Sequence, residues 1–122
     1  MLRRQWGLFV NRVIWSTSGV IHVWKTEESF RMWFSANAVS ATAAILLPLD
    51  PASRGMLLMG GVMILAMECA NTAIERVTDD ISEEIRDRAR QAKDAGSAAV
   101  ALMGVGVGVG WISVLWGLAM AG

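Results

Sequence analysis

The stretch AGSAAVALMGVGVGVGWISVLWGLAMAG, residues 95–122, runs for 28 residues without a charged side chain. A helix needs about 20 apolar residues to cross a bilayer, so this stretch predicts a transmembrane helix from about residue 96 to 120. The alternation of glycine and valine between Gly104 and Gly110 is locally typical of a strand. A lone strand would leave its backbone groups unsatisfied in lipid, so we expect a helix. The glycines that are spaced four apart favour close packing against another helix.

Two further stretches predict transmembrane helices. Residues 32–49 carry no charge over 18 residues, and a turn with two prolines lies at their end. Residues 55–77 are apolar through Met67 and then carry three polar or acidic side chains, Glu68, Asn71 and Glu75. We therefore expect three membrane-spanning helices in one small all-α domain that covers the whole chain.

The segments that flank these spans are more polar. Residues 5–28 repeat apolar side chains at helical spacing, which is typical of an amphipathic helix on the membrane surface. Residues 78–95 hold most of a run of twelve charges and are expected to be a charged, water-exposed segment. Basic residues are concentrated in both segments, so the positive-inside rule predicts that both are cytoplasmic and that the C-terminus lies outside.

The charge content excludes two large classes of protein. The chain has 11 basic and 11 acidic residues among 122, and 18% of its residues are charged. Soluble domains carry roughly 25% charged residues, so this content and its uneven distribution exclude an ordinary soluble globule. A net charge of zero provides no basic face, so we expect no nucleic-acid partner.

Four polar side chains in and just after the second predicted span share one helix face. Glu68, Asn71, Glu75 and Asp79 are spaced by three, four and four residues, so they project within about 80°. Acidic groups inside a membrane helix are costly and persist when they are paired, bind cations or handle protons. Hydrogen bonding between helices is the structural alternative. Carboxylates at this depth can hold Mg²⁺ or accept a proton from a lipid hydroxyl, and Lys93 could neutralise phosphate oxygens.

The same residues carry a resemblance to a known family. The segment ECANTAIERVTD, residues 68–79, resembles the signature of the small bacterial integral-membrane diacylglycerol kinases. The segment AKDAGSAAV, residues 92–100, resembles their second motif, and Gly19, Glu27 and the pair Phe30-Arg31 follow the spacing of that family. The resemblance covers nearly the whole chain, with the same length and three-span layout as the family. It is specific because two separated motifs lie in the same register.

The resemblance implies a homotrimer in the bacterial inner membrane, with active sites shared between protomers at the cytoplasmic boundary. The implied reaction transfers the γ-phosphoryl group of ATP, with Mg²⁺ as cofactor, to the free hydroxyl of 1,2-diacylglycerol and forms phosphatidic acid. By motif position, Glu68 is the proton acceptor, and Glu27 and Glu75 hold the metal. The implied nucleotide-binding residues are Glu27, Glu75, Glu84, Arg86, Lys93 and Asp94, with polar support from Asn71 and Asp79. The implied lipid-binding residues are Ser16, Arg31, Glu68, Ser97 and Trp111.

Two other functions compete with this interpretation. A sister branch of the family phosphorylates undecaprenol with a similar site, but the run GSAA at residues 96–99 resembles the diacylglycerol branch. A non-enzymatic membrane transporter could use the acids as a proton relay. A transporter would leave the Lys93-Asp94 pair and the charged segment unexplained, so we expect a diacylglycerol kinase.

Overall fold

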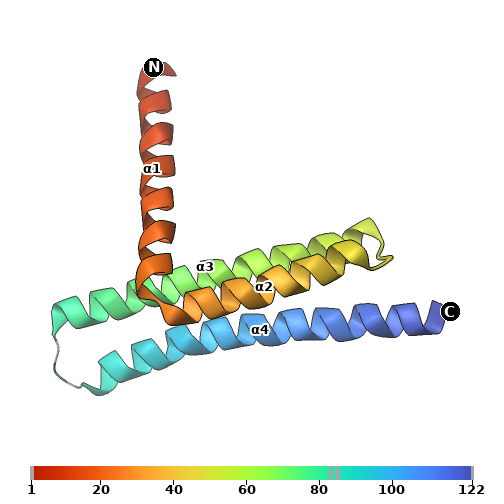
Figure 1. The fold of residues 1–122 in the computed structure, drawn as a ribbon. Helices are drawn as coiled ribbons and strands as arrows, with labels where there is room; N and C mark the ends of the chain where they lie inside the picture. Colours follow the sequence, from red (N-terminus) through yellow and green to blue (C-terminus); the bar gives the residue numbers. More distant parts are fainter. Residues whose placement is uncertain (1, 83, 85, 122) are drawn as a thin grey trace.

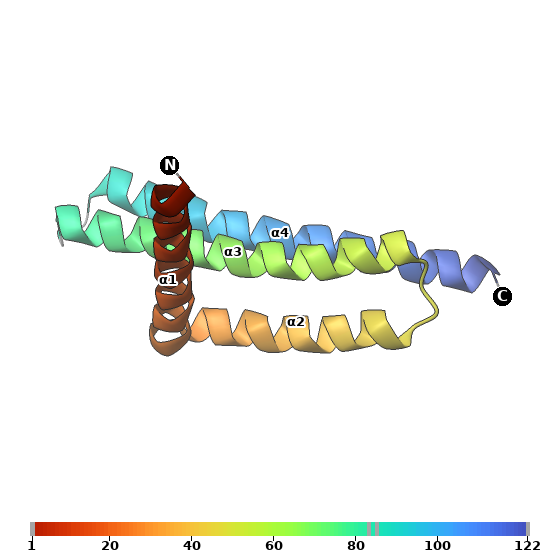
Figure 2. The ribbon, with the colours of Figure 1, turned by 90° about the horizontal axis from the view of Figure 1, so that it is seen from above.

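A computed structural model describes residues 2–82, 84 and 86–121, which form four helices and no strand (Figure 1). The helices are α1 (Leu2–Thr26), α2 (Glu28–Leu46), α3 (Pro51–Ile81) and α4 (Asp87–Ala121). Helices α2, α3 and α4 lie alongside one another, whereas α1 stands crosswise to them in both views (Figures 1 and 2). The expectation of an all-helical chain is confirmed.

The corner between α1 and α2 consists of one residue. Glu27 has extended backbone angles, φ −106° and ψ 116°, and its N–H donates to the carbonyl of Val23 at 2.8 Å, which closes the last turn of α1. Val23 is buried, whereas the side chains of residues 3–22 are exposed. Helix α1 is therefore held to the rest of the chain only near its C-terminal end.

Aromatic and guanidinium groups hold the corner in shape. The ring of Trp24 meets the rings of Phe30 and Phe34 edge-on, with centroid separations of 6.4 and 5.1 Å. Arg31 Nη1 on α2 donates to the carbonyl of Trp24 at 2.8 Å. The first two turns of α2 thus bind the last turn of α1 through packing and through a hydrogen bond to its backbone.

The turn between α2 and α3 is built by proline chemistry and caps. Pro48 disfavours helical angles at the preceding residue, and Leu47 is extended with φ −74° and ψ 150°. Asp50 caps α3, because its carboxylate accepts the N–H groups of the residues two and three positions on at 2.9 and 3.1 Å. The guanidinium of Arg54 donates to three carbonyls at the end of α2 and in the turn, those of Ala44, Leu47 and Leu49.

Helices α3 and α4 run antiparallel and approach most closely at glycines. A Cβ atom added at Gly60 would lie 2.7 Å from Val107 Cγ2, and one added at Gly104 would lie 2.7 Å from a ring carbon of Trp33 on α2. The glycine spacing therefore predicts close packing correctly at Gly104 and at Gly110, where an added Cβ would lie 3.3 Å from Leu57 Cδ2. Added Cβ atoms at Gly106 and Gly108 would meet nothing within 4 Å, so these two do not pack against the described part of the chain.

Helices α3 and α4 are, within the described residues, the two that are long and apolar enough to cross a membrane. Of their most apolar windows, 28% and 6% respectively are buried, which is unlike the core helix of a soluble protein. Helix α2 does not reach this hydropathy, because its 19 residues include several serines, an asparagine and a threonine. Two of the three predicted spans are supported, and the crossing by α2 remains a prediction.

The ends of the observed helices differ from those of the predicted segments. Helix α2 occupies 28–46 rather than 32–49, and α3 occupies 51–81 rather than 55–77. Helix α4 begins at residue 87 rather than 96, so the charged segment is divided between the ends of α3 and α4. Residues 83 and 85 of that segment lie outside the described residues.

Candidate functional site

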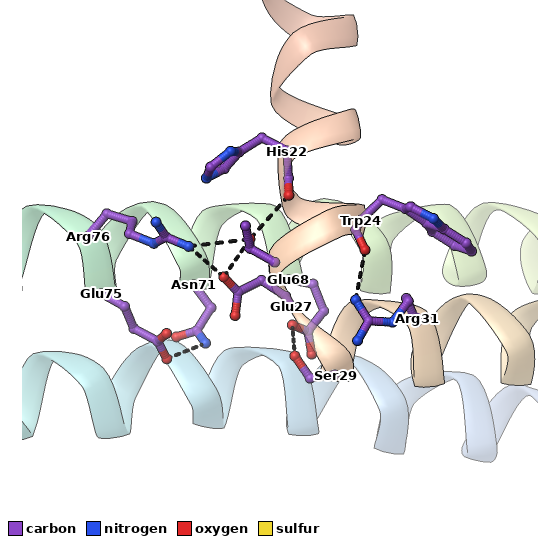
Figure 3. A network of polar contacts seen from close by, with 10 residues as sticks. His22, Trp24, Glu27, Ser29, Arg31, Glu68, Asn71, Glu75 and Arg76 are labelled. Atoms are coloured by element: carbon purple, nitrogen blue, oxygen red, sulfur yellow. Dashed lines mark hydrogen bonds and ion pairs between the residues drawn. The ribbon is translucent and has the colours of Figure 1, made fainter.

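Glu68 is the most deeply buried member of the acidic face of α3. Glu68 is only 4% exposed. The hydroxyl of Ser29 donates a hydrogen bond to Glu68 Oε2 at 2.9 Å (Figure 3). Ser29 lies in the first turn of α2, so the start of α2 covers this carboxylate. The arrangement places one acceptor oxygen of Glu68 under a fixed hydroxyl donor beside the α1–α2 corner.

Asn71 and Glu75 form the next step along the same face. Asn71 Nδ2 donates to Glu75 Oε1 at 3.0 Å, as expected for residues four apart on a helix. Asn71 Oδ1 is buried and has no hydrogen-bond partner within residues 2–82, 84 and 86–121. A Cβ atom added at Gly96 would lie 2.2 Å from that oxygen, so α4 needs glycine there to accommodate Asn71.

Glu27 faces α3 from the corner. It occupies the N-cap position of α2 but makes no side-chain capping bond. Its Oε1 accepts a hydrogen bond from Arg76 at 2.8 Å and lies 2.9 Å from the hydroxyl of Thr26. The Arg76 hydrogen bond, followed by that of Thr26, holds the pKa of the Glu27 carboxyl below its ordinary value. The Glu27 carboxyl is therefore ionised at neutral pH.

The charged ends of α3 and α4 enclose a cavity of about 220 Å³. Lys93 Nζ donates to Asp79 Oδ1 at 2.5 Å and links the two helices. Arg90 pairs with Asp94 at 3.2 Å one turn apart on α4. The cavity is lined by Asp79, Ser82, Glu84, Arg86, Ala89, Arg90, Lys93 and Asp94. Four residues predicted to bind nucleotide, Glu84, Arg86, Lys93 and Asp94, thus lie around one hollow.

The predicted lipid-binding residues are not gathered at one place. Arg31 lies at the corner, and Ser97 is exposed one residue after Gly96. Ser16 is on the exposed part of α1, ten residues before Thr26. Trp111 lies near the α2–α3 turn, where it packs against the buried cluster of Ala44, Leu49 and Leu57, and its indole N–H donates to Ser40 Oγ at 2.8 Å. Within one chain, Trp111 is therefore separate from the acidic face.

The residues present fit a hard divalent cation with few protein ligands. No group of three His, Cys, Asp or Glu side chains that could hold a metal occurs in the part of the chain that the structure describes. Mg²⁺ commonly uses only one or two carboxylates and takes its other ligands from water and phosphate. Glu27 and Glu75 offer carboxylate oxygens, and the orphaned oxygen of Asn71 adds a neutral acceptor beside Glu75.

Three residues that complete this site have no role predicted from the sequence: Thr26, Ser29 and Arg76. The contacts of Ser29 and Arg76 join residues 39 and 49 positions apart, so no local periodicity could reveal them. The one local indication of this contact is the position of Arg76 directly after Glu75, because a cation beside an acidic helix face can pair with a nearby carboxylate.

Comparison with known proteins identifies similar chains. A family model described as prokaryotic diacylglycerol kinase matches residues 14–115. A diacylglycerol kinase of Escherichia coli K12 is 31% identical over 102 residues, which cover 84% of each chain. Another from Pseudomonas aeruginosa is 30% identical over 108 residues and 88% of each chain. A third from Haemophilus influenzae is 30% identical over 113 residues, covering 88% of this chain and 91% of the relative. These matches confirm the resemblance that the motifs carry.

Proposed function

The chain belongs to the prokaryotic diacylglycerol kinase family and is a kinase, and from this premise we propose that it transfers the γ-phosphoryl group of ATP to 1,2-diacylglycerol. The product is phosphatidic acid. The observation that carries the proposal is Glu68, a buried carboxylate in an apolar helix that is long enough to cross a membrane. Such a group has access to a lipid alcohol that a soluble kinase would not reach.

Glu68 acts as the general base. As the free hydroxyl of the lipid attacks the γ-phosphorus, its proton passes to the Glu68 carboxylate, the bond from the γ-phosphorus to the β–γ bridging oxygen breaks, and ADP leaves. The hydrogen bond from Ser29 to Oε2 supports this role, because it orients the carboxylate and leaves its other oxygen to accept the proton.

The nucleotide lies along the cytoplasmic ends of α3 and α4. The cavity between these ends supports this part of the proposal, since Arg86 and Lys93 supply the positive charge that phosphates require. Glu27 and Glu75 would hold Mg²⁺, which neutralises charge on the phosphates.

The enzyme works as a homotrimer in the bacterial inner membrane, with its N-terminus and active site cytoplasmic and its C-terminus periplasmic. The exposed apolar side chains of α3 and α4 support this assembly, because they must be covered by lipid or by neighbouring protomers.

The test is phosphorylation of a lipid alcohol in mixed micelles with radiolabelled ATP and Mg²⁺. Wild-type protein should label diacylglycerol, and Glu68→Gln should lower the rate at least a hundredfold because general-base catalysis contributes about 10²–10⁴-fold. Asp80→Asn is the matched control on the same helix, because Asp80 is exposed and outside the site.

Three results would contradict the proposal. Preferential labelling of undecaprenol would assign the other lipid acceptor. Wild-type rates in Glu68→Gln would remove that residue from the mechanism. Equal losses in Glu68→Gln and Asp80→Asn would show that the assay reports folding rather than chemistry.

A further inference from the structure

Arg76 lies on α3 directly after Glu75 and reaches across to the α1–α2 corner (Figure 3). Its Nη2 donates to Glu27 Oε1 at 2.8 Å and contacts Thr26 Oγ1 at 3.3 Å. One guanidinium therefore touches the last residue of α1 and the single residue that connects α1 to α2. The proposed reaction does not by itself assign a role to Arg76.

Both hydrogen bonds to the Glu27 carboxylate are made to the same oxygen, Oε1. The guanidinium of Arg76 and the hydroxyl of Thr26 both bind Oε1. The single hydrogen of that hydroxyl is shared with the carbonyl of His22, which lies 3.1 Å from Thr26 Oγ1, so Arg76 is the steadier donor. The two contacts fix the orientation of the carboxylate while Oε2 stays open to another ligand.

Because of its place at the start of α2, the side chain of Glu27 needs a residue from another helix to fix its orientation. N-cap side chains ordinarily bind the first N–H groups of their own helix, but Glu27 does not. Without Arg76, only the hydroxyl of Thr26, which is shared with the carbonyl of His22, would hold its side chain. The guanidinium of Arg31 on α2 does not take over this function from Arg76, because it is hydrogen-bonded to the carbonyl of Trp24.

We infer that Arg76 is a positioning residue, which holds the Glu27 carboxylate over α3 in the orientation needed to bind Mg²⁺. The inference rests on the proposed function for the role of Glu27, but the contact itself does not. Groups that orient metal ligands in this way typically change metal affinity or activity by about 10–100-fold when they are removed.

Stabilisation of the fold is a poor explanation for the same pair. The side chain of Arg76 is 53% exposed and that of Glu27 is 23% exposed, and ion pairs in such settings add little to stability. The planar guanidinium, in contrast, suits orientation, because its donors are fixed relative to one another and match a carboxylate. Removing Arg76 should therefore change the site much more than the fold.

The first arm of the test measures the corner without nucleotide or metal. Hydrogen exchange of the backbone amides at residues 24–27, the last hydrogen-bonded turn of α1, should be at least about threefold faster in Arg76→Ala than in wild-type protein, since the corner loses its link to α3. Arg88→Ala is the matched control, because Arg88 is an exposed arginine outside the site. Arg76→Lys should restore most of the protection, since an ammonium reaches the same oxygen.

The second arm measures the Mg²⁺ dependence of lipid phosphorylation. Arg76→Ala should raise the Mg²⁺ concentration for half-maximal rate about tenfold, at the low end of the effect of lost orienting groups, with a smaller change at saturating Mg²⁺. Arg76→Lys should recover part of the affinity, and Arg88→Ala should match wild type. Faster exchange together with the raised Mg²⁺ requirement supports the inference.

Each contrary outcome has its own meaning. Unchanged exchange in Arg76→Ala would overturn the contact, and faster exchange with an unchanged Mg²⁺ requirement would overturn the positioning role. A lowered requirement would show that Arg76 competes with the cation, which also overturns it. If wild-type protein phosphorylated no lipid alcohol at any Mg²⁺ concentration, the proposed function would fail, while the exchange arm would still decide whether Arg76 orders the corner.

Discussion

Glu27 and Glu28 are neighbours in the sequence with different surroundings. Glu27 is turned toward α3 and paired with Arg76, whereas Glu28 is exposed in the first turn of α2. Glu28 has a simple structural role there, because a negative charge near a helix N-terminus is favourable. The two residues therefore provide a matched pair for separating metal binding from local charge.

We expect Glu27→Gln to lower the rate of lipid phosphorylation at least about tenfold at moderate Mg²⁺, because one of the two carboxylates proposed to hold the metal loses its charge. Glu28→Gln should stay within about twofold of wild type, since it changes the same charge one residue away. Rates measured across a Mg²⁺ titration check both variants. Equal effects in the two would show that only the net charge of the corner matters.

Asp50 gives a prediction about pH. Hydrogen bonds from Ser53, with a smaller one from the N–H of Ala52, hold the pKa of the Asp50 carboxyl below its usual value of 3.8. A lowered folded-state pKa means that the ionised cap stabilises α3 above pH 3.8, and that this stabilisation is lost as pH falls through the folded-state pKa. Asp50→Ala should therefore melt at a lower temperature than wild type at pH 7.

The difference in melting temperature between wild type and Asp50→Ala should shrink once pH falls well below 3.8. Circular dichroism in detergent micelles at several pH values measures it. A difference that is constant from pH 7 to pH 2.5 would show that the charge of Asp50 does not contribute to the cap.

The acidic face shows which part of the site could be predicted from sequence. Glu68, Asn71 and Glu75 recur at helical spacing, and helical geometry alone places them on one face. The links from Ser29 and Arg76 could not be predicted, because they depend on how the α1–α2 corner folds onto α3. Residue spacing reveals what one helix presents, but not what a second helix brings to it.

At the scale of elements, the helix ends differ from prediction for physical reasons. Spans were predicted from the absence of charge, but the helical backbone forms its hydrogen bonds whether or not lipid surrounds it. Helix α2 therefore begins before Arg31, among charged residues, and ends at Leu46 because Pro48 disfavours helical angles at Leu47. Helix α3 begins at Pro51 beside its Asp50 cap and continues through its charged end to Ile81.

Close approach between α3 and α4 predicts opposite effects for two glycines. Gly96→Ala should reduce stability by about 1–3 kcal/mol, since its Cβ would overlap Asn71 Oδ1, and should also reduce activity by moving Asn71 away from Glu75. Gly55→Ala meets nothing within 4 Å and should stabilise α3 by up to about 1 kcal/mol.

Unfolding in mixed micelles with increasing dodecyl sulfate, together with lipid phosphorylation, measures both glycine variants. If Gly96→Ala were as stable and as active as Gly55→Ala, Asn71 would have room to move and the packing at that point would be loose.

At the scale of the whole molecule, the chain is an open assembly of helices rather than a closed globule. Helix α4 exposes most of its apolar side chains, and α1 contacts the rest of the chain only near its last turns. The hydropathy of α3 and α4 predicts their place in the membrane, but the crossing by α2 and the orientation follow from charge counting alone.

Labelling with a membrane-impermeant maleimide tests the orientation. In a Cys69→Ala background, we expect Ala52→Cys to react from outside intact spheroplasts. Lys25→Cys and Asp80→Cys should react only after permeabilisation, because their segments are rich in basic residues. All three side chains are exposed. Labelling of Lys25→Cys from outside would show that α2 does not separate the two sides.

The single residue at the α1–α2 corner has a consequence for how the protein responds to its host membrane. Spanning helices change their tilt when the surrounding acyl chains become shorter or longer. A long flexible linker between α1 and α2 would absorb such a change. Here α1 ends at Thr26 and α2 begins at Glu28, so the linker is a single residue. Because α2 is predicted to span the membrane, we expect a change in bilayer thickness to move the carboxylate of Glu27, and lipid composition should then change activity through a residue that is proposed to hold the cation.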